Sequence, residues 1–285
     1  MAEIVPEMRW DAPLRLLGGL HYLALAEGID PWSDVRSVLA ERGEWLARFV
    51  VEQGVQTNEV RRSWGLLPVF LLAARDAGRP LDLVELGTSA GLNLVWDRYC
   101  YRYEAGEWGG DEARVVLSGE ERRPVPRDLL SVRPAVRRRT GIDLSPIDVA
   151  TEEGARLLEC FVWADQAERI ARLRQAIDVL REDPPELIRG DYVRLLPGLL
   201  EERDDEALTV VYQTASFGFL TDEERASVLG AIEAAGRDGR LAFVTAAFDP
   251  EREGCFPLDL TLWPGGRTRR AAYADFHGAW LEWVA

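Results

Sequence analysis

The chain has 285 residues, of which 47% are hydrophobic and 29% are charged, and its formal net charge is −15. This composition is typical of a globular protein with a sizeable core, and it excludes an intrinsically disordered chain. The negative charge disfavours DNA or RNA as a partner, because binding to phosphates depends on a cationic surface.

The few cysteines and histidines also exclude several kinds of site. Cys100, Cys160 and Cys255 are scattered and form no Cys-x-x-Cys pair, so we expect neither a disulfide framework nor a zinc site. With His21 and His277 as the only histidines, we expect no metal centre. The chain has neither a long apolar run nor an N-terminal signal pattern. We therefore expect a cytoplasmic protein that acts away from membranes.

The first part of the chain is predicted to be helical. Apolar residues recur at helical spacing through residues 11–79, whereas from residue 80 the pattern alternates between strands and helices. That alternation is typical of a parallel sheet with helical crossovers. We therefore expect a helical N-terminal extension or lid, 1–79, and an α/β domain, 80–285.

Within the α/β domain the predicted elements follow one another at short intervals. Strands are expected at 81–86, 141–143, 186–189, 207–213 and 240–247. Helices are expected from about Ala90, over 164–181, and after Thr221, where Thr-Asp-Glu-Glu forms a capping box. Two further segments, 258–263 and 267–273, flank Pro-Gly-Gly and predict an antiparallel hairpin at the edge of the sheet.

An insertion interrupts this pattern at about 99–138. Tyr99, Tyr101 and Tyr103 alternate as in a strand, so 99–118 is predicted to form a hairpin. Residues 114–139 hold eight arginines against three acidic residues. They form either a solvated face or a surface that binds an anionic substrate or partner.

The most informative segment, 81–91, reads Leu-Asp-Leu-Val-Glu-Leu-Gly-Thr-Ser-Ala-Gly. An apolar strand is followed by two spaced glycines and a helical pattern. Glycine lets the backbone adopt angles that a Cβ forbids and lets a ligand approach closely, and open α/β sheets bind nucleotide-like molecules at such a turn. We expect a small cofactor to bind here, at Glu85, Gly87, Ser89, Gly91 and Asn93.

Polar residues also follow the next predicted strands. Asp143 ends the second strand, where a carboxylate can accept both ribose hydroxyls of a nucleoside. Asp191 and Tyr192 follow the third strand and are expected beside the base. Tyr212 and Gln213 end the fourth strand, at the edge of the sheet where substrates bind.

With these motifs in order, the chain resembles the class I S-adenosylmethionine-dependent methyltransferases. Residues 85–91 look like their first motif and 141–146 like their second, and the resemblance covers about 81–248. It implies a Rossmann-like, methyltransferase-type fold of seven strands, mostly parallel, with the antiparallel hairpin at its C-terminal edge. It also implies S-adenosylmethionine as cofactor and methyl transfer to a small-molecule acceptor.

The runs 56–60, 87–103 and 280–283 more closely resemble an uncharacterised bacterial branch of that superfamily, a domain of unknown function. Two features depart from the superfamily pattern. The spacing between Glu85 and Asp143 exceeds the usual twenty or so residues. No Asn-Pro-Pro-Tyr-like motif follows the fourth strand, which disfavours methylation of a nucleobase or amide amine.

Four polar residues are candidates for the catalytic work: His21, Glu59, Tyr212 and Gln213. His21 lies on an apolar helix, where a structural role in the core is the alternative. Glu59 lies in a polar cluster with Asn58 and Arg62, just before the cofactor strand. That cluster could close over the cofactor as a lid, or it could cap the next helix.

Two other functions stay open. The first is a non-catalytic protein that binds S-adenosylmethionine or another nucleoside, since no evident base follows the fourth strand. The second is a serine hydrolase, because residues 87–91 also fit Gly-x-Ser-x-Gly with Ser89 as nucleophile. Its partners would be Asp249 or Asp259, and His277. The hydrolase is disfavoured because its nucleophile normally follows several strands.

Overall fold

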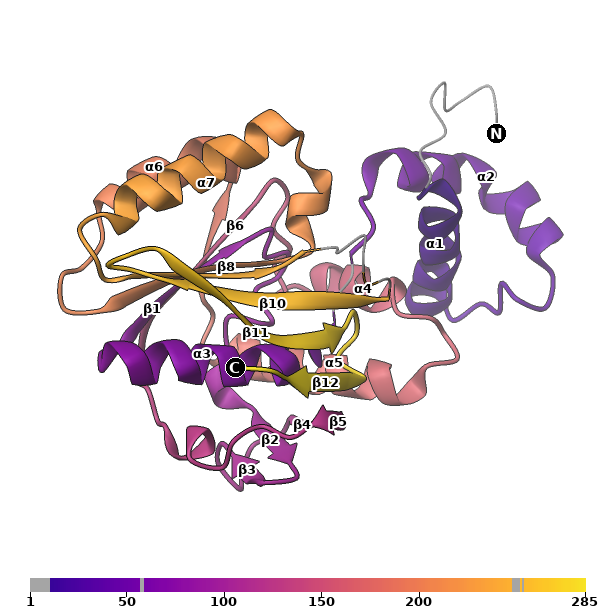
Figure 1. The fold of residues 1–285 in the computed structure, drawn as a ribbon. Coiled ribbons are helices and arrows are strands. Elements are labelled where there is room, and N and C mark those ends of the chain that lie inside the picture. The colour runs from indigo at the N-terminus through magenta and orange to yellow at the C-terminus, as the bar shows by residue number, and fades with distance from the viewer. Residues whose placement is uncertain (1–10, 57–58, 248–251, 253) are drawn as a thin grey trace. The chain divides into compact units, whose positions relative to one another are not determined.

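The computed structural model describes residues 11–56, 59–247, 252 and 254–285. The chain forms two compact units (Figure 1). The first, which we call the helical unit, comprises Met1–Asn58 and Ile147–Arg181. The second, the sheet unit, comprises Glu59–Pro146 and Glu182–Ala285.

The described part of the helical unit contains α1 (Ala12–Glu27), α2 (Val35–Glu52), α4 (Glu152–Cys160) and α5 (Ala167–Glu182). Helix α1 packs against both α2 and α4, and Leu20, Leu23 and Leu46 form its core. Side chains cap two of the helices, since Asp34 accepts the Ser37 amide of α2 and Thr151 accepts the Gly154 amide of α4. The predicted helices in 11–56 are confirmed, whereas the sequence did not predict α4.

A nine-stranded sheet forms the centre of the sheet unit within the described residues, in the order β5-β12-β11-β10-β9-β8-β1-β6-β7. Its strands are β1 (Leu81–Leu86), β5 (Glu120–Arg123), β6 (Val136–Asp143), β7 (Glu186–Arg189), β8 (Leu208–Thr214), β9 (Leu241–Ala246), β10 (Cys255–Leu262), β11 (Arg267–Asp275) and β12 (Trp280–Trp283).

Neighbouring strands from β7 to β9 are parallel, those from β9 to β12 are antiparallel, and β5 is parallel to β12. The prediction of an α/β fold with a mostly parallel sheet is confirmed. The predicted number of seven strands was wrong, because β12 and β5 extend the sheet beyond the predicted hairpin. The hairpin itself, β10–β11, is present but does not lie at the edge.

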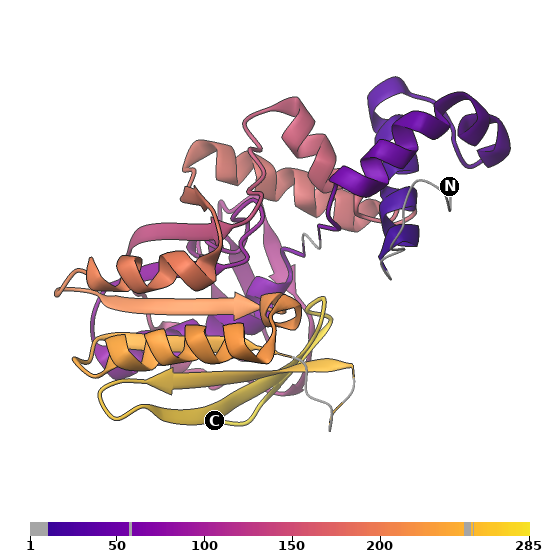
Figure 2. The same cartoon turned by 90° about the horizontal axis from the view of Figure 1, so that it is seen from above.

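Helices cover both faces of the parallel strands. Helices α6 (Tyr192–Glu201) and α7 (Asp222–Gly236) pack side by side on one face (Figures 1 and 2). They cover a cluster of side chains that includes Val84 and Leu86 of β1 and Phe243 of β9. The capping box of α7 is confirmed, because Thr221 and Glu224 exchange hydrogen bonds with each other's backbone.

Helix α3 (Arg62–Ala77) lies on the opposite face, drawn below the sheet in Figure 1. It contacts β9, β10 and β11, and Gly65 permits this packing because a Cβ there would lie 3.2 Å from that of Ala274. Helix α3 therefore belongs to the sheet unit. This partition differs from the expected division at residues 79 and 80.

The insertion forms a small separate sheet of β2 (Cys100–Tyr103), β3 (Gly106–Trp108) and β4 (Val116–Ser118). Strands β2 and β3 are antiparallel, so the predicted hairpin is confirmed. The insertion packs on α3 through Tyr103, whose ring stacks on that of Trp64 with centroids 5.3 Å apart. The Tyr103 hydroxyl donates to the Trp64 carbonyl at 2.5 Å.

The helix predicted from about Ala90 was wrong. After β1 the chain makes successive turns and a short 3₁₀ helix, Trp96–Arg98. Backbone hydrogen bonds throughout this segment span three residues rather than four, as from the Leu94 amide to the Gly91 carbonyl. Trp96 is completely buried against Phe70 of α3, with ring centroids 5.2 Å apart. Tertiary packing thus overrides the local helical pattern.

Candidate functional site

The predicted cofactor residues lie at the carboxyl ends of β1, β6, β7 and β8. Parallel strands end at the same edge of a sheet, so residues far apart in sequence meet there. We call this region the carboxyl-edge site. Its residues are Glu85, Gly87, Ser89, Asp143, Asp191, Tyr192, Tyr212 and Gln213.

The glycine loop after β1 has an unusual backbone. Gly87, Ser89 and Gly91 have φ angles of 76°, 55° and 84°, in the left-handed region that glycine adopts freely and serine rarely does. A Cβ at Gly87 would lie only 2.5 Å from the Cβ of Ser216. Glycine is therefore required at position 87 both for its backbone angle and for close packing.

Asp143 ties this loop to the end of β6. Its Oδ2 accepts the Ser89 amide at 2.8 Å, and its Oδ1 accepts the Ser145 amide at 2.9 Å. A carboxylate offers about four acceptor positions, so Asp143 can accept further hydrogen bonds. The side chain is half-buried, which suits a group that contacts a bound hydroxyl.

Glu85 lies beneath the loop and is 2% exposed. Burial raises its pKa to about 8, and the hydrogen bond that Thr88 Oγ1 donates to its Oε2 at 2.7 Å opposes that rise. The Tyr212 hydroxyl also faces Glu85 and lowers its pKa. Tyr212 makes no hydrogen bond of regular geometry with the described residues. At neutral pH the Glu85 carboxyl is therefore mostly protonated.

Asp191 and Tyr192 begin α6. Asp191 is the N-cap residue, and its Oδ1 accepts the Val193 amide at 2.9 Å. The Tyr192 hydroxyl lies 3.4 Å from the Ser216 carbonyl, to which it donates. The capping alternative for Asp191 thus has a clear structural basis, and Tyr192 connects α6 to the segment after β8.

Gln213 is completely buried at the end of β8. Its Nε2 donates to Thr245 Oγ1 at 2.6 Å, and its Oε1 accepts the Phe217 amide at 3.3 Å. Ser216, three residues further along the chain, donates from its hydroxyl to the Leu86 carbonyl at 2.8 Å. These bonds fix the 3₁₀ turn Ser216–Phe219 against the glycine loop, so the Gln213 amide is engaged within the protein.

The start of α3 brings further charge toward Glu85. Glu59 is buried, and its Oε1 accepts the Arg61 amide at 3.0 Å in the turn just before α3. Arg62 lowers the pKa of Glu85 and donates from Nε to the Phe276 carbonyl at 2.8 Å. Asn58, the third member of the predicted lid, lies outside the described residues.

Two further predicted residues are held by hydrogen bonds within their own units. Asn93 accepts a hydrogen bond at 2.7 Å from Ser63 of α3, which fixes the turn after the glycine loop. His21 belongs to the helical unit, where it is buried with Nδ1 3.2 Å from the Cys160 carbonyl. This contact accords with the structural alternative for His21.

The hydrolase arrangement has mixed support. The positive φ of Ser89 is typical of a strained nucleophile turn, but no α-helix follows it. Asp259 is ion-paired with Arg270 at 2.5 Å on the neighbouring strand, and Asp249 lies outside the described residues. Of the two predicted acids, the one that the structure describes is therefore engaged by an arginine.

Sequence reasoning missed Thr88 and underrated Arg62. Thr88 is 6% exposed and donates to Glu85, and Arg62 supplies the nearby positive charge. The pairing of Glu85 with Tyr212 across β1 and β8 could have been found from the strand alternation, once the two strands were placed side by side.

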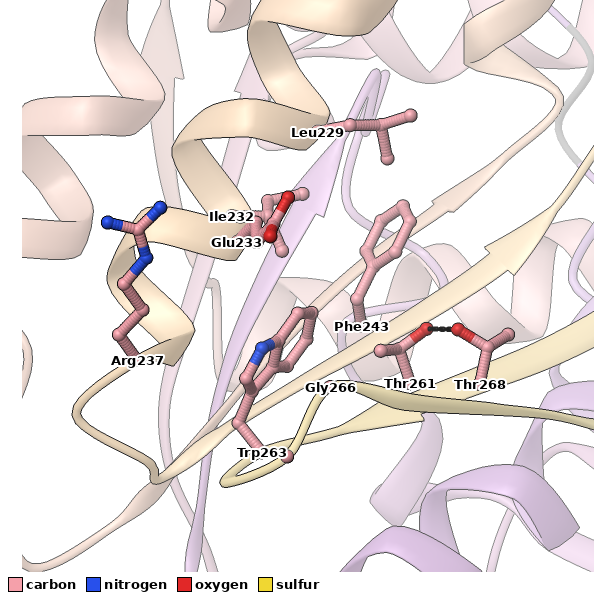
Figure 3. Close-up of a pocket in the computed structure, with 10 residues that line it drawn as sticks. Leu229, Ile232, Glu233, Arg237, Phe243, Thr261, Trp263, Gly266 and Thr268 are labelled. Carbon is pink, nitrogen blue, oxygen red and sulfur yellow. Dashed lines mark hydrogen bonds between the residues drawn. The ribbon is translucent and has the colours of Figure 1, made fainter.

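A hollow of about 640 Å³ lies elsewhere, between α7 and the β10–β11 hairpin (Figure 3). Phe243 and Trp263 form apolar walls, and Thr261 bonds to Thr268 at 2.7 Å. Thr261 pairs with Phe243 in the first half of β9, so the hollow lies toward the amino end of that strand. It is separate from the carboxyl-edge site.

The described residues contain no group of three or more histidine, cysteine or acidic side chains that could hold a metal ion. Cys100, Cys160 and Cys255 are all buried, and none of the three forms a disulfide. Among the helices of the described chain, none has the length and apolar character needed to cross a membrane.

The fold and site define an α/β protein whose polar residues converge on a glycine loop at the carboxyl edge of a mostly parallel sheet. The chain belongs to the DUF2332 family, described as an uncharacterized protein conserved in bacteria, whose model matches residues 3–283. The predicted resemblance to an uncharacterised bacterial family is thereby confirmed. A search of the curated proteins found no match.

Proposed function

We propose that this protein binds S-adenosylmethionine at the carboxyl-edge site of a Rossmann-like sheet and transfers its methyl group to a small-molecule acceptor. The observation that carries the proposal is the contact between Asp143, at the end of β6, and the glycine loop that follows β1. A carboxylate beside such a loop can accept ribose hydroxyls while the loop passes close to the ligand.

The strand order supports this assignment. From β1 the chain continues to β6 and β7 on one side, and then crosses to β8 and β9 on the other. The direction of winding therefore reverses between β1 and β8. Ligands of open α/β sheets bind at the carboxyl ends of the strands beside such a reversal, which is where Glu85, Gly87 and Tyr212 lie.

The residues at the site fit the chemical groups of this cofactor. Asp143 retains acceptor positions for two hydroxyls, and Arg62 supplies positive charge near Glu85 for an anionic group. An ammonium group beside Glu85 would favour the ionised carboxylate. Gly87 permits close approach of the backbone. The catalytic roles of Glu59, Tyr212, Gln213 and His21 remain predictions.

S-adenosylmethionine supplies an activated methyl group together with its leaving group. The protein then has to align the acceptor, exclude water and, for some acceptors, remove a proton. Tyr212 is buried beside Glu85 and has no regular hydrogen-bond partner among the described residues. Burial and the neighbouring Glu85 raise the pKa of Tyr212 well above its ordinary value, so Tyr212 would act as a hydrogen-bond donor to that carboxyl rather than as a base.

A non-catalytic binding protein is the second candidate function. Its support comes from Asp191 and Gln213, which are engaged as a helix cap and as a buried amide rather than exposed as bases. Such a protein would bind S-adenosylmethionine and S-adenosylhomocysteine without turnover. Incubation with methyl-labelled S-adenosylmethionine and a bacterial small-molecule extract separates the two, since only the enzyme transfers label.

Calorimetric titration with both nucleosides tests the cofactor assignment. Asp143→Ala should abolish binding, whereas Asp148→Ala should preserve it. Asp148 is the matched control because its Oδ1 also accepts a nearby amide, that of Ala150, but it makes no bond to the glycine loop in the described chain. Circular dichroism of each variant establishes that a loss of binding is not a loss of fold.

A further inference from the structure

A cavity of about 550 Å³ lies at the amino edge of the sheet, at the opposite ends of β1 and β6 from the carboxyl-edge site. Its walls come from the first residues of these strands, from the segment before β7 and from the C-terminal end of α6. The residues that matter for its chemistry are Asp82, Arg138, Thr140, Leu199, Arg203 and Thr209.

Asp82 is a buried acid in this cavity. Its side chain is 6% exposed, and its Oδ1 has no hydrogen-bond partner among the described residues. Asp82 pairs in register with Arg138 of β6 and Thr209 of β8, so the strands present a polar group of three at one level of the sheet. Burial raises the pKa of Asp82, although the nearby charges of Arg137 and Arg138 oppose that rise.

Arg203 supplies an unsatisfied cation to the same cavity. Its Nη2 donates to the Ala235 carbonyl at 2.9 Å, whereas its buried Nη1 has no partner in the described chain. Burial lowers the pKa of Arg203. Leaving a buried charged group without a partner is costly, and this cavity contains one such atom of each sign.

We propose that the cavity binds a zwitterionic small molecule of the α-amino-acid class, with its ammonium group at Asp82 and its carboxylate at Arg203. A zwitterion satisfies both unpartnered atoms without adding net charge to the cavity. A simple anion would leave Asp82 Oδ1 without a partner, and a simple amine would leave Arg203 Nη1 without one. Arg138, whose charge lowers the pKa of Asp82, also lines the cavity and offers a second guanidinium to the carboxylate.

The remaining walls favour an aliphatic side chain. Val84, Ile188 and Leu199 line the cavity beside the charged groups. Its volume lies within the range of about 300–1,000 Å³ that is typical of small-molecule sites. L-leucine is therefore a suitable ligand with which to test the site. The inference does not depend on methyl transfer, because the two sites occupy opposite edges of the sheet.

Calorimetry on the full-length protein tests the proposal with four compounds: L-leucine, L-leucinamide, 4-methylpentanoate and inorganic phosphate. We expect L-leucine to bind saturably. The amide, which lacks the carboxylate, and the acid, which lacks the ammonium, should each bind at least about tenfold more weakly. Phosphate should not bind.

Asp82→Asn should weaken L-leucine binding by about tenfold or more. Glu206→Gln, on the adjoining loop but outside the cavity lining, and Asp143→Ala at the other site should not. The proposal is overturned if L-leucine gives no saturable heat, which would mean that water alone fills the cavity. It is also overturned if either analogue or phosphate binds as well as L-leucine, or if Asp82→Asn binds unchanged. The analogue series uses the native chain, so a variant that fails to fold does not affect it.

Discussion

The buried carboxyl of Glu85 should make the stability of the protein depend on pH. Burial raises its pKa from 4.5 to about 8. Because the folded-state pKa exceeds the unfolded value, the folded protein holds this proton more tightly. Glu85 therefore contributes most to stability below about pH 4.5, and that contribution is lost as the pH rises through about 8.

The size of the effect follows from the same two values. At about 1.4 kcal/mol per pKa unit, a shift of this size corresponds to an upper limit of about 5 kcal/mol. Relaxation around the ionised group would reduce this, so we expect at least about 2 kcal/mol between pH 5 and 8.5. Glu85→Gln removes the titration and retains an oxygen that can accept the Thr88 hydroxyl.

Urea unfolding of both proteins at pH 5, 7 and 8.5 measures this difference directly. The free energy of unfolding of the wild type should fall relative to that of Glu85→Gln as the pH rises. Thr88→Val is a second variant, in which valine has nearly the same shape as threonine. It removes a hydrogen bond that lowers the Glu85 pKa, so the loss of stability with rising pH should occur at higher pH in this variant than in the wild type. The reasoning would be refuted if wild type and Glu85→Gln ran parallel across this range.

Three further substitutions test the packing around the site and α7. Gly87→Ala should destabilise the protein by about 2 kcal/mol or more, since its φ is 76° and the new Cβ would approach that of Ser216 to 2.5 Å; a loss below about 0.5 kcal/mol in urea unfolding would contradict this. Tyr212→Phe should change stability by less than about 1 kcal/mol, because the buried hydroxyl has no regular partner in the described chain, and thermal unfolding checks it. Thr221→Ala should cost about 1 kcal/mol by removing the capping box of α7, and an unchanged urea midpoint would count against that role.

Strands β1, β8 and β9 were predictable because each is a short apolar run bounded by polar or turn residues. Strand β6 begins at Val136, before the predicted 141–143, because three arginines in its first half conceal the strand pattern. The range 186–189 matches β7, and the expected 207–213 and 240–247 differ from β8 and β9 by one residue at either end. The capping box at Thr221 was equally readable, since it depends on residues three positions apart. The residues that define each of these features lie close together in the sequence, so the sequence pattern alone was enough to predict them.

Non-local contacts explain most of what the sequence did not predict. Strand β12 pairs with β5, a short segment from the insertion, and no local pattern indicates that partnership. Residues 90–99 have helical spacing, but burial of Trp96 against Phe70 holds them in turns. The boundary near residue 79 was expected because α3 looks like the preceding helices, yet α3 packs on the sheet.

The candidate site was predictable in its position but less so in its chemistry. Strand order placed Glu85, Asp143 and Tyr212 at one edge, as the order of the motifs implied. The bonding of Gln213 and the capping by Asp191 depend on partners in other elements. Residue identity alone therefore could not separate ligands from structural supports at this edge.

Binding of S-adenosylmethionine and S-adenosylhomocysteine, measured by calorimetry on the wild type and on Asp143→Ala, tests the central proposal most directly. We expect saturable binding of both nucleosides to the wild type and none to the variant, because Asp143 both holds the glycine loop and offers acceptors to the ribose. Absence of binding to the wild type, or equal binding to a folded Asp143→Ala, would contradict the proposal.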